Sequence, residues 1–489
     1  MRRYDVTIAG GGIAGLATAE IFARSGWSTL LIEKNPRLCT ETSGSHHEWF
    51  HLGSLYSIFP NRQFLRTLAG GVEDLFEYYR DFDGMNLRVD GEGGLLKVDH
   101  PHAWFRPDNL EYIIATTSDP DFDFSRVDGL RELGGALYNR LLWNTAIRLF
   151  ICRHNRFHKH DWRRGGASSY ISRAGVFDYS RRQLTSFDPV EVGIELDPRT
   201  HLRMPSYDGP MHALHIVTDL TRSLLAHGGE IRTSAALEGY RRGAGGFEVS
   251  FGGETVHTRK LILATGAALG DHAAGRLRVQ SVRSPLLIAY PAVCERNVVR
   301  LTPFIDETVN HLLHSVDGHD YSLIGGGYFA EMDDAEGAAR VEKRLIERAR
   351  DVFPRLRHSR LQKVYFGTKS EVVGRSGNRN YLYRIEELEP DVTAIVPGKF
   401  SLAFSLAMTT FRRVAGAAPV THTSYDSALE VDEYVDLTIH RRIVRDFVAE
   451  QSITDSRPAI PLHVGKQHSL SSNPAAIHSR PSHPSRRSV

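Results

Sequence analysis

The stretch that decides the fold is YDVTIAGGGIAGLATAEIFARSGWSTLLIE, residues 4–33. Its apolar pattern predicts a buried strand at Val6–Ala9, a helix at Leu16–Arg24 and a second buried strand at Ser28–Ile32. A glycine-rich turn joins the first strand to the helix, and an acid, Glu33, ends the second strand. This order of strand, glycine turn, helix, strand and acid is the fingerprint of a dinucleotide-binding βαβ unit.

The glycine-rich turn has the spacing Gly-x-Gly-x-x-Gly, and each glycine has a physical task. Gly10 permits the tight turn, Gly12 lets the backbone approach a pyrophosphate, and Gly15 lets helix and strand pack closely. Ile13 and Ala14 stand at the start of the helix, where free N–H groups and a partial positive charge favour phosphates. All five residues are therefore predicted to contact a dinucleotide.

The acid after the second strand completes the motif. Glu33 follows the glycines by about the ~20 residues expected of an acid that accepts hydrogen bonds from ribose hydroxyls. We include its neighbour Lys34 in the predicted cofactor site. A Gly-x-Gly-x-x-Gly alone could be a turn with a purely structural role. Here both strands, the helix and the acid accompany it, which argues against that alternative.

Composition sets the class of protein and its surroundings. The 489 residues are 41% hydrophobic and 24% charged, which suggests a globular protein of two or more domains. The net charge of +2 gives no reason to expect nucleic-acid binding. The chain enters its first strand almost at once and has no apolar run of about 20 residues, so we expect a cytoplasmic protein. Cys39, Cys152 and Cys294 are far apart, and neither disulfides nor a metal site is expected.

Two later segments bear on the organisation of the chain. Residues 137–164 join an apolar helical face to a basic run. Such a segment can make a peripheral contact at the inner membrane face, or it can be a helix packed on the protein with a solvated basic loop. Beyond residue 453 the chain is rich in Ser, Pro and His, so residues 454–489 are predicted to be a disordered tail.

After Glu33 come two segments that carry a family resemblance. Thr42, Ser43 and Gly44 belong to a Ser/Thr-rich segment, and His51-x-Gly53-x-x-Tyr56 follows it. The chain here resembles the FAD-dependent oxidoreductases of the D-amino acid oxidase type, and within them the glycerol-3-phosphate dehydrogenase branch. The resemblance implies that the first segment wraps the pyrophosphate and ribityl chain of FAD. It implies that the second lies against the isoalloxazine ring.

Two more elements are similar to that family and occur in its order. Gly398-Lys399-Phe400-Ser401 is similar to a Gly-Lys-Leu-Thr turn that opens a helix at the pyrimidine end of the flavin. The helix dipole, with Lys399 or the backbone amides, would then stabilise a negatively charged reduced flavin. Leu263–Gly266 matches the Ala-Thr-Gly element that follows a strand in flavoproteins with two dinucleotide-binding segments, which adds Thr265 and Gly266 to the predicted FAD site.

The chain also departs from the family pattern. Leu55 stands where the glycerol-3-phosphate branch has an arginine. Where the family usually has Gly-x-Arg-Pro, with an arginine that holds the substrate anion, this chain reads GTKS, with Lys369 in the arginine's place. Lysine can hold an anion as a point charge, and Arg375 and Arg379 follow closely enough to substitute. Glycerol 3-phosphate itself is therefore doubtful as the substrate.

The resemblance implies an α/β fold of the D-amino acid oxidase type. We expect a Rossmann-like, doubly wound FAD-binding domain together with a second α+β substrate or cap domain. The first is assigned to residues 1–60, 211–280 and 365–430, and the second to 61–210 and 281–364. A C-terminal helix is predicted at residues 431–453.

The predicted activity is removal of a hydride from a C–H group that bears a hydroxyl or an amino group, in a small acidic substrate. An alcohol needs a base for its proton, and His51 is the first candidate and Tyr56 the second. Lys369, Arg375 or Arg379 would hold a carboxylate or phosphate. The electron acceptor, whether oxygen, a quinone or a protein, stays open. So do two alternatives: a flavin-dependent monooxygenase, and a membrane-surface or assembly protein that retains FAD.

Overall fold

The structure is a computed structural model of the chain. It describes residues 1–50, 67, 71, 74–75, 78, 87–89, 96–98, 110–115, 194–197, 199–205, 209–272, 276–302, 308–373, 382–420 and 428–455. The chain divides into two compact units, residues 1–447 and 448–489. In the second unit only the last turns of one helix are described.

The first sheet contains the dinucleotide-binding motif. Its strands run in the order β10-β11-β12-β1-β2-β9, and β20 pairs with β12 and with β19. The strands β1, β2, β9, β12 and β20 pair in parallel, whereas the pairs β10–β11, β11–β12 and β19–β20 are antiparallel. The bounds are β1 (Arg3–Ala9), β2 (Thr29–Ile32), β9 (Glu230–Arg232), β10 (Leu237–Gly243), β11 (Gly246–Phe251), β12 (Glu254–Leu263), β19 (Arg384–Glu389) and β20 (Val392–Val396).

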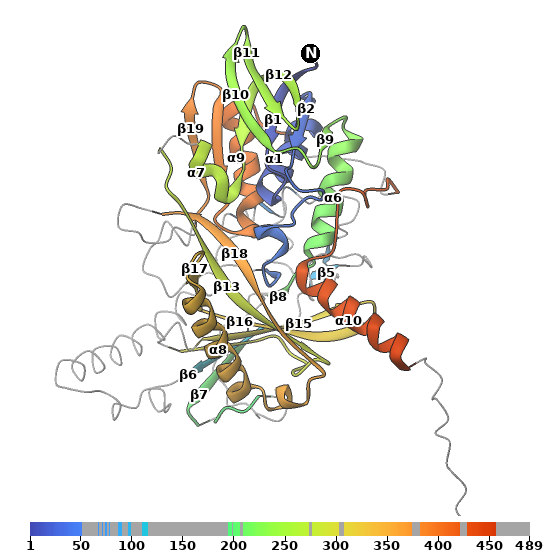
Figure 1. Cartoon of the computed structure of the whole chain (residues 1–489), viewed down its shortest axis with the longest axis vertical. Coiled ribbons are helices and arrows are strands. Elements are labelled where there is room, and N and C mark those ends of the chain that lie inside the picture. The colour runs from blue at the N-terminus through green and yellow to red at the C-terminus, as the bar shows by residue number, and fades with distance from the viewer. Residues whose placement is uncertain are drawn as a thin grey trace, which may run out of the picture. The chain divides into compact units, whose positions relative to one another are not determined.

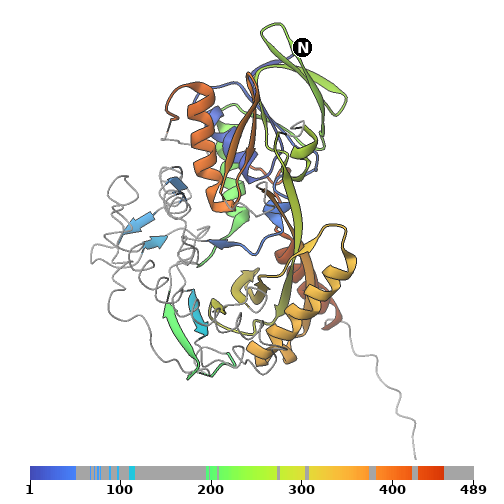
Figure 2. The same ribbon diagram turned by 90° about the vertical axis from the view of Figure 1, so that its left-hand side faces the viewer.

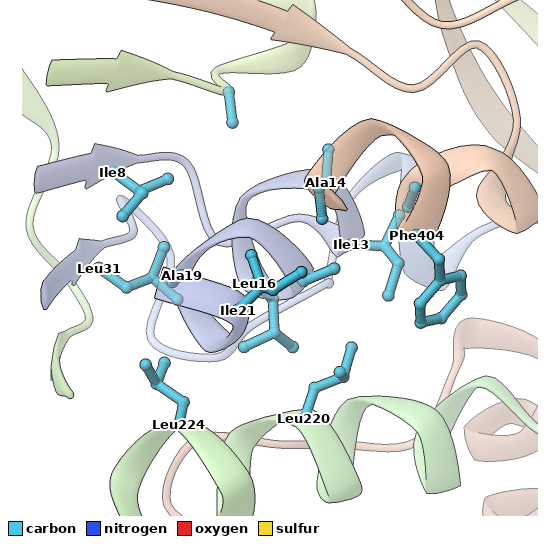
Figure 3. Close-up of a cluster of buried hydrophobic side chains, with 14 of the residues drawn as sticks. Ile8, Ile13, Ala14, Leu16, Ala19, Ile21, Leu31, Leu220, Leu224 and Phe404 are labelled. Carbon is cyan, nitrogen blue, oxygen red and sulfur yellow. The ribbon is translucent and has the colours of Figure 1, made fainter. Parts of the chain in front are cut away.

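Three helices pack with this sheet around one apolar core. They are α1 (Ile13–Arg24), α6 (Ala213–Ala226) and α9 (Ala403–Ala415). Figure 3 shows Leu16 and Ile21 of α1 close to Leu220 and Leu224 of α6, while Phe404 of α9 lies beside the start of α1. The predicted strand–turn–helix–strand unit is confirmed, with the helix beginning at Ile13.

The second sheet has the order β17-β13-β16-β15-β14-β6-β7, with β18 also paired to β13. Helix α8 (Ala335–Val352) packs on one face through Leu345, Ala349 and Val352 (Figure 2). The strand bounds are β6 (Glu111–Ala115), β7 (His201–Pro205), β13 (Val279–Tyr290), β14 (Val298–Leu301), β15 (Val309–Val316), β16 (His319–Gly326), β17 (Ala330–Glu331) and β18 (Leu361–Val372).

The remaining described elements are short, apart from the C-terminal helix α10 (Figure 1). Among the described residues, no helix is long and apolar enough to cross a membrane. The segment 137–164 lies outside them. The elements are η1 (Thr42–Gly44), β3 (Trp49–Phe50), β4 (Leu87–Val89), β5 (Leu96–Val98), β8 (Gly209–Pro210), η5 (Gly266–Ala268), α7 (Leu269–His272), η7 (Pro354–His358), η8 (Phe400–Leu402) and α10 (Ile439–Asp455).

Two predicted boundaries differ from the structure. Strand β18 pairs with β13 along its whole length, so residues 365–372 lie in the second sheet, whereas the sequence assigned them to the FAD-binding domain. Helix α10 begins at Ile439 and not at residue 431. The reason is that the backbone before it bonds elsewhere: the carbonyl of Tyr434 accepts from the amide of Leu38 at 2.8 Å. The division of the chain into two domains stays a prediction.

Candidate active site

Among the three glycines of the motif, only Gly12 leaves open space beside its backbone. Gly10 has φ +108°, and a Cβ there would lie 2.4 Å from the carbonyl oxygen of Ala264. A Cβ on Gly15 would lie 1.8 Å from the carbonyl oxygen of Gly10. At Gly12 a Cβ would meet only Ser43 Oγ, at 3.4 Å. The first and third glycines are therefore required by the chain's own packing, whereas Gly12 presents the open backbone that a pyrophosphate needs.

Glu33 lies buried at the end of β2, beside this turn. One carboxylate oxygen accepts a hydrogen bond from the Gly11 amide at 2.6 Å, and the other accepts from the Asn35 amide at 2.9 Å. Burial raises the pKa of Glu33, and these two hydrogen bonds oppose that rise. Lys34 pairs at the surface with Glu41, 2.6 Å away. A buried carboxylate in this position fits the recognition of a ribose.

The Ser/Thr-rich segment is held against the start of α1. Ser43 Oγ accepts a hydrogen bond from the Ile13 amide at 3.0 Å. The η1 turn is close-packed, since a Cβ on Gly44 would lie 2.4 Å from the carbonyl oxygen of Cys39. Two segments that the sequence assigns to FAD, some thirty residues apart, are thus brought together at the helix N-terminus.

The Ala-Thr-Gly element lies next to the same turn, because β12 pairs in parallel with β1. The Ala264 amide donates to the carbonyl of Ala9 at 2.7 Å. Thr265 Oγ1 is buried and has no hydrogen-bond partner among the described atoms. Gly266 follows with φ +55° and open space around its Cα. These features fit a polar ligand at the carboxyl ends of the parallel strands.

The turn at residues 398–401 meets the segment that contains His46 from another direction. Gly398 has φ +67°, and the chain then enters η8 and α9. The ring of Phe400 contacts that of His46 edge to face, with centroids 4.8 Å apart. Lys399 is near enough for its charge to contribute to the lowered pKa of His47.

Strand β18 brings Lys369 to the same place. Two residues before it, a Cβ on Gly367 would lie 2.4 Å from the carbonyl oxygen of Ser45, so strand and segment are in direct contact. Burial, followed by the charge of Lys369, lowers the pKa of His46 to about 3 and lowers the pKa of His47 well below its ordinary value. Lys369 Nζ also lies 4.7 Å from the centroid of the Phe329 ring.

The structure therefore places Lys369 and Lys399 beside a pair of buried, neutral imidazoles. Nε2 of His46 has no hydrogen-bond partner among the described atoms, although it is buried. Such a group calls for a partner that the described residues do not supply. An FAD whose phosphates lie at the glycine turn, and whose ring system lies along His46 and His47, would fit these donors.

Five predicted site residues lie outside the described residues, and their assignments stay predictions. They are His51, Gly53, Tyr56, Arg375 and Arg379.

A buried ionic cluster next to the histidine pair was not anticipated from the sequence. Glu48 is fully buried and pairs with Arg441 of α10 at 2.7 Å. His314 and His440 lie in contact with the pair. The residues come from segments about 390 positions apart, and Arg441 stands in an Arg-rich helix where nothing local marks it as buried.

The fold and these segments define a flavoprotein oxidoreductase. A family model matches residues 5–386 of the chain; the family is labelled DAO and described as FAD dependent oxidoreductase. The chain belongs to this family. It is an enzyme, and its cofactor is FAD, which when bound accepts a hydride from the substrate. The alternative of an assembly protein that only retains FAD is not supported. A comparison with curated protein sequences found no match.

Solved structures show the same fold at low sequence identity. Glycine oxidase from Geobacillus kaustophilus is 17% identical, with a TM-score of 0.57 over 89% of this chain and 99% of that one. L-alpha-glycerophosphate oxidase from Mycoplasma pneumoniae, solved with FAD bound, is 14% identical, with a TM-score of 0.57 over 88% and 99%. L-proline dehydrogenase from P. horikoshii is 14% identical, with a TM-score of 0.55 over 91% and 99%.

Proposed function

We propose that this enzyme oxidises a small acidic substrate at a C–H group bearing an amino or hydroxyl group, and that Lys369 holds the acid. The observation that carries the proposal is the position of Lys369 on β18, two residues after Gly367, which is in direct contact with the carbonyl of Ser45 beside the histidine pair. A cation at this buried segment can fix the anionic end of a substrate. The C–H bond would then be oriented toward the cofactor.

The chemistry of the neighbouring structures supports an acidic substrate. Glycine, L-proline and glycerophosphate, which the names of the three relatives contain, share a carboxylate or phosphate near the carbon that is oxidised. A lysine recognises either group as a point charge, without the bidentate geometry that an arginine imposes. Both carboxylates and phosphates therefore remain within the proposed substrate class.

The two neighbouring histidines can serve as neutral contacts. Because the pKa of His46 is about 3, its imidazole carries no charge at neutral pH and does not compete with Lys369 for the substrate anion. Lys399 and the start of α9 add positive charge where a reduced flavin would become negative. His51 and Tyr56 stay the proposed bases for an alcohol substrate, whereas an amine that binds unprotonated needs none.

Anaerobic bleaching of the bound flavin tests this proposal. The purified holoenzyme is mixed under argon with amino acids, hydroxy acids, polyol phosphates and their uncharged analogues, and the visible flavin band is followed. We expect bleaching by members of one acidic class and none by the analogues that lack the acid. Bleaching by the uncharged analogues alone would refute an anion site. Reoxidation of the reduced enzyme by oxygen or by a soluble quinone then identifies its electron acceptor.

A further inference from the structure

The ionic cluster of Glu48 and Arg441 has no role in the function proposed above. Glu48 follows the histidine pair immediately in the chain, and the side chains of Glu48 and Arg441 are almost completely removed from water, with 0% and 4% exposed. Burying two charges costs more than their attraction returns unless the geometry is very good, so a buried pair is weak evidence for stability. The contacts of the pair show instead what it holds in place.

Arg441 ties three parts of the protein together. Its Nε and Nη2 donate to the same oxygen of Glu48, at 3.0 and 2.7 Å, and its Nη1 donates to the carbonyl of Ser315 on β15 at 2.6 Å. The other oxygen of Glu48 accepts from the amide of Ala213, the first residue of α6, at 2.9 Å. The Glu48 carboxylate thus joins the starts of α6 and α10, and the Arg441 guanidinium connects them to β15 of the second sheet.

His314 links Arg441 to the histidine pair of His46 and His47. Its Nδ1 lies 3.4 Å from Arg441 Nη2, which is a donor, so Nδ1 accepts and the ring proton is on Nε2. Nε2 donates to the carbonyl of His47 at 3.2 Å. Burial, followed by the charge of Arg441, lowers the pKa of His314 well below its ordinary value and keeps this tautomer neutral.

The backbone of the held segment is itself in an uncommon conformation. Glu48 has φ +51°, in the left-handed region that non-glycine residues rarely adopt. Such conformations persist only when the surroundings determine them strongly, and they gather at functional sites. The Glu48 amide also donates to His46 Nδ1 at 2.8 Å, so the turn at Glu48 sets the direction of the His46 ring.

We propose that Arg441 is a positioning residue for the cofactor site: through Glu48 and His314 it fixes the backbone and the imidazoles of His46 and His47 against the flavin. In this role Arg441 acts through Glu48 and His314 and need not contact substrate or cofactor itself. The inference rests on the placement of His46 and His47 beside the flavin, but not on the identity of the substrate.

The test uses the full-length holoenzyme and two arginines that are neighbours in α10. Arg442 pairs with Asp436 at 2.7 Å and is 43% exposed, so Arg442→Met removes the same charge without touching the cluster. For Arg441→Met we expect FAD to bind about tenfold more weakly or worse. We also expect the visible spectrum and midpoint potential of the bound flavin to change, and Arg442→Met to match the wild type in all three. Arg441→Lys keeps the positive charge but loses the planar guanidinium with its several donors. Its FAD affinity, flavin spectrum and midpoint potential are expected to lie between those of the wild type and of Arg441→Met.

The double variant Glu48→Gln/Arg441→Met separates positioning from folding. It leaves no unpaired buried charge, so it is expected to be more stable than Arg441→Met and carries the test if that variant does not fold. Its flavin spectrum, potential and FAD affinity should still differ from the wild type. Wild-type values in the double variant would overturn the proposal and leave the pair a structural element only. Bleaching of the wild-type flavin by substrate tests the proposed function separately.

Discussion

At the scale of single residues, two glycines of the turn are expected to have different roles: Gly15 is required by the fold and Gly12 by the cofactor. Gly12→Ala is expected to keep the thermal stability of the apoprotein, because its Cβ would meet only Ser43 Oγ at 3.4 Å. It should weaken FAD binding at least about tenfold, because the methyl group stands where the pyrophosphate approaches. Fluorescence titration of the apoprotein with FAD measures the change, and unchanged affinity would contradict this assignment.

Gly15→Ala is the matched variant at the same turn. Its Cβ would lie 1.8 Å from the carbonyl oxygen of Gly10, so helix and strand would have to move apart. Overpacking of this kind costs about 1–3 kcal/mol, and we expect a lower unfolding midpoint in urea. The packing around each glycine thus agrees with the separate tasks that the motif gives to Gly12 and Gly15.

Sequence patterns predicted the glycine turn and Glu33, whose arrangement is local. The spacing of the glycines and the acid at Glu33 was sufficient, because a βαβ unit imposes both within thirty residues. Glu48 and Arg441 could not be found in this way. Their contact depends on how α10 meets the second sheet, and neither the charge nor the helical pattern of either segment encodes that arrangement.

At the scale of elements, α8 offers a test of how a side chain caps a helix. Asp334 caps the helix by accepting a hydrogen bond from the Gly337 amide at 2.7 Å. Asp334→Ala should lower the free energy of unfolding by about 0.5–2 kcal/mol, since an amide is left without its partner. Denaturant unfolding measures this loss. The adjacent substitution Asp333→Ala is the control, and equal effects of the two would contradict the capping role.

Element boundaries were less predictable than element types. Helix α8 has an acidic start and a clear apolar stripe, so its sequence is enough to define it. Helix α10 begins later than predicted, because the preceding residues bond to the loop at Leu38. The predicted domain boundary at residue 365 falls inside strand β18, because the sheet of this strand is determined by its pairing with β13 and not by its own residues.

At the scale of the whole molecule, buried histidines make stability depend on pH. The pKa of each of five histidines is lowered by burial, to about 3 for His46 and about 4 for His311. The pKa values of His47, His314 and His440 are also lowered. Unfolded histidine titrates near 6.5, so the unfolded chain binds more protons below that pH. Stability is therefore full above about pH 6.5 and is lost as the pH falls toward the folded values.

Urea unfolding between pH 7.5 and pH 5 measures this loss. Each such histidine contributes up to about 1.4 kcal/mol per pH unit, so five of them make the slope steep. His311→Gln should reduce the slope by about the contribution of one histidine. His311 is chosen because it bonds Ser322 and the carbonyl of Arg296, away from the cofactor site. His358→Gln, at an exposed position, is the matched control. A stability that does not change over this range would contradict the burial of these rings.

The most direct test of the proposed function is the anaerobic reduction of the flavin in Lys369→Met. Methionine keeps most of the side chain and removes the charge. With an acidic substrate that bleaches the wild type, we expect reduction to be roughly 10- to 150-fold less efficient, from a lost charge-assisted hydrogen bond of about 1.5–3 kcal/mol. FAD content should be normal, and Lys363→Met, exposed on the same strand, should behave like the wild type. Wild-type reduction in Lys369→Met would contradict the account, and loss in Arg375→Met or Arg379→Met instead would move the anion site to that residue.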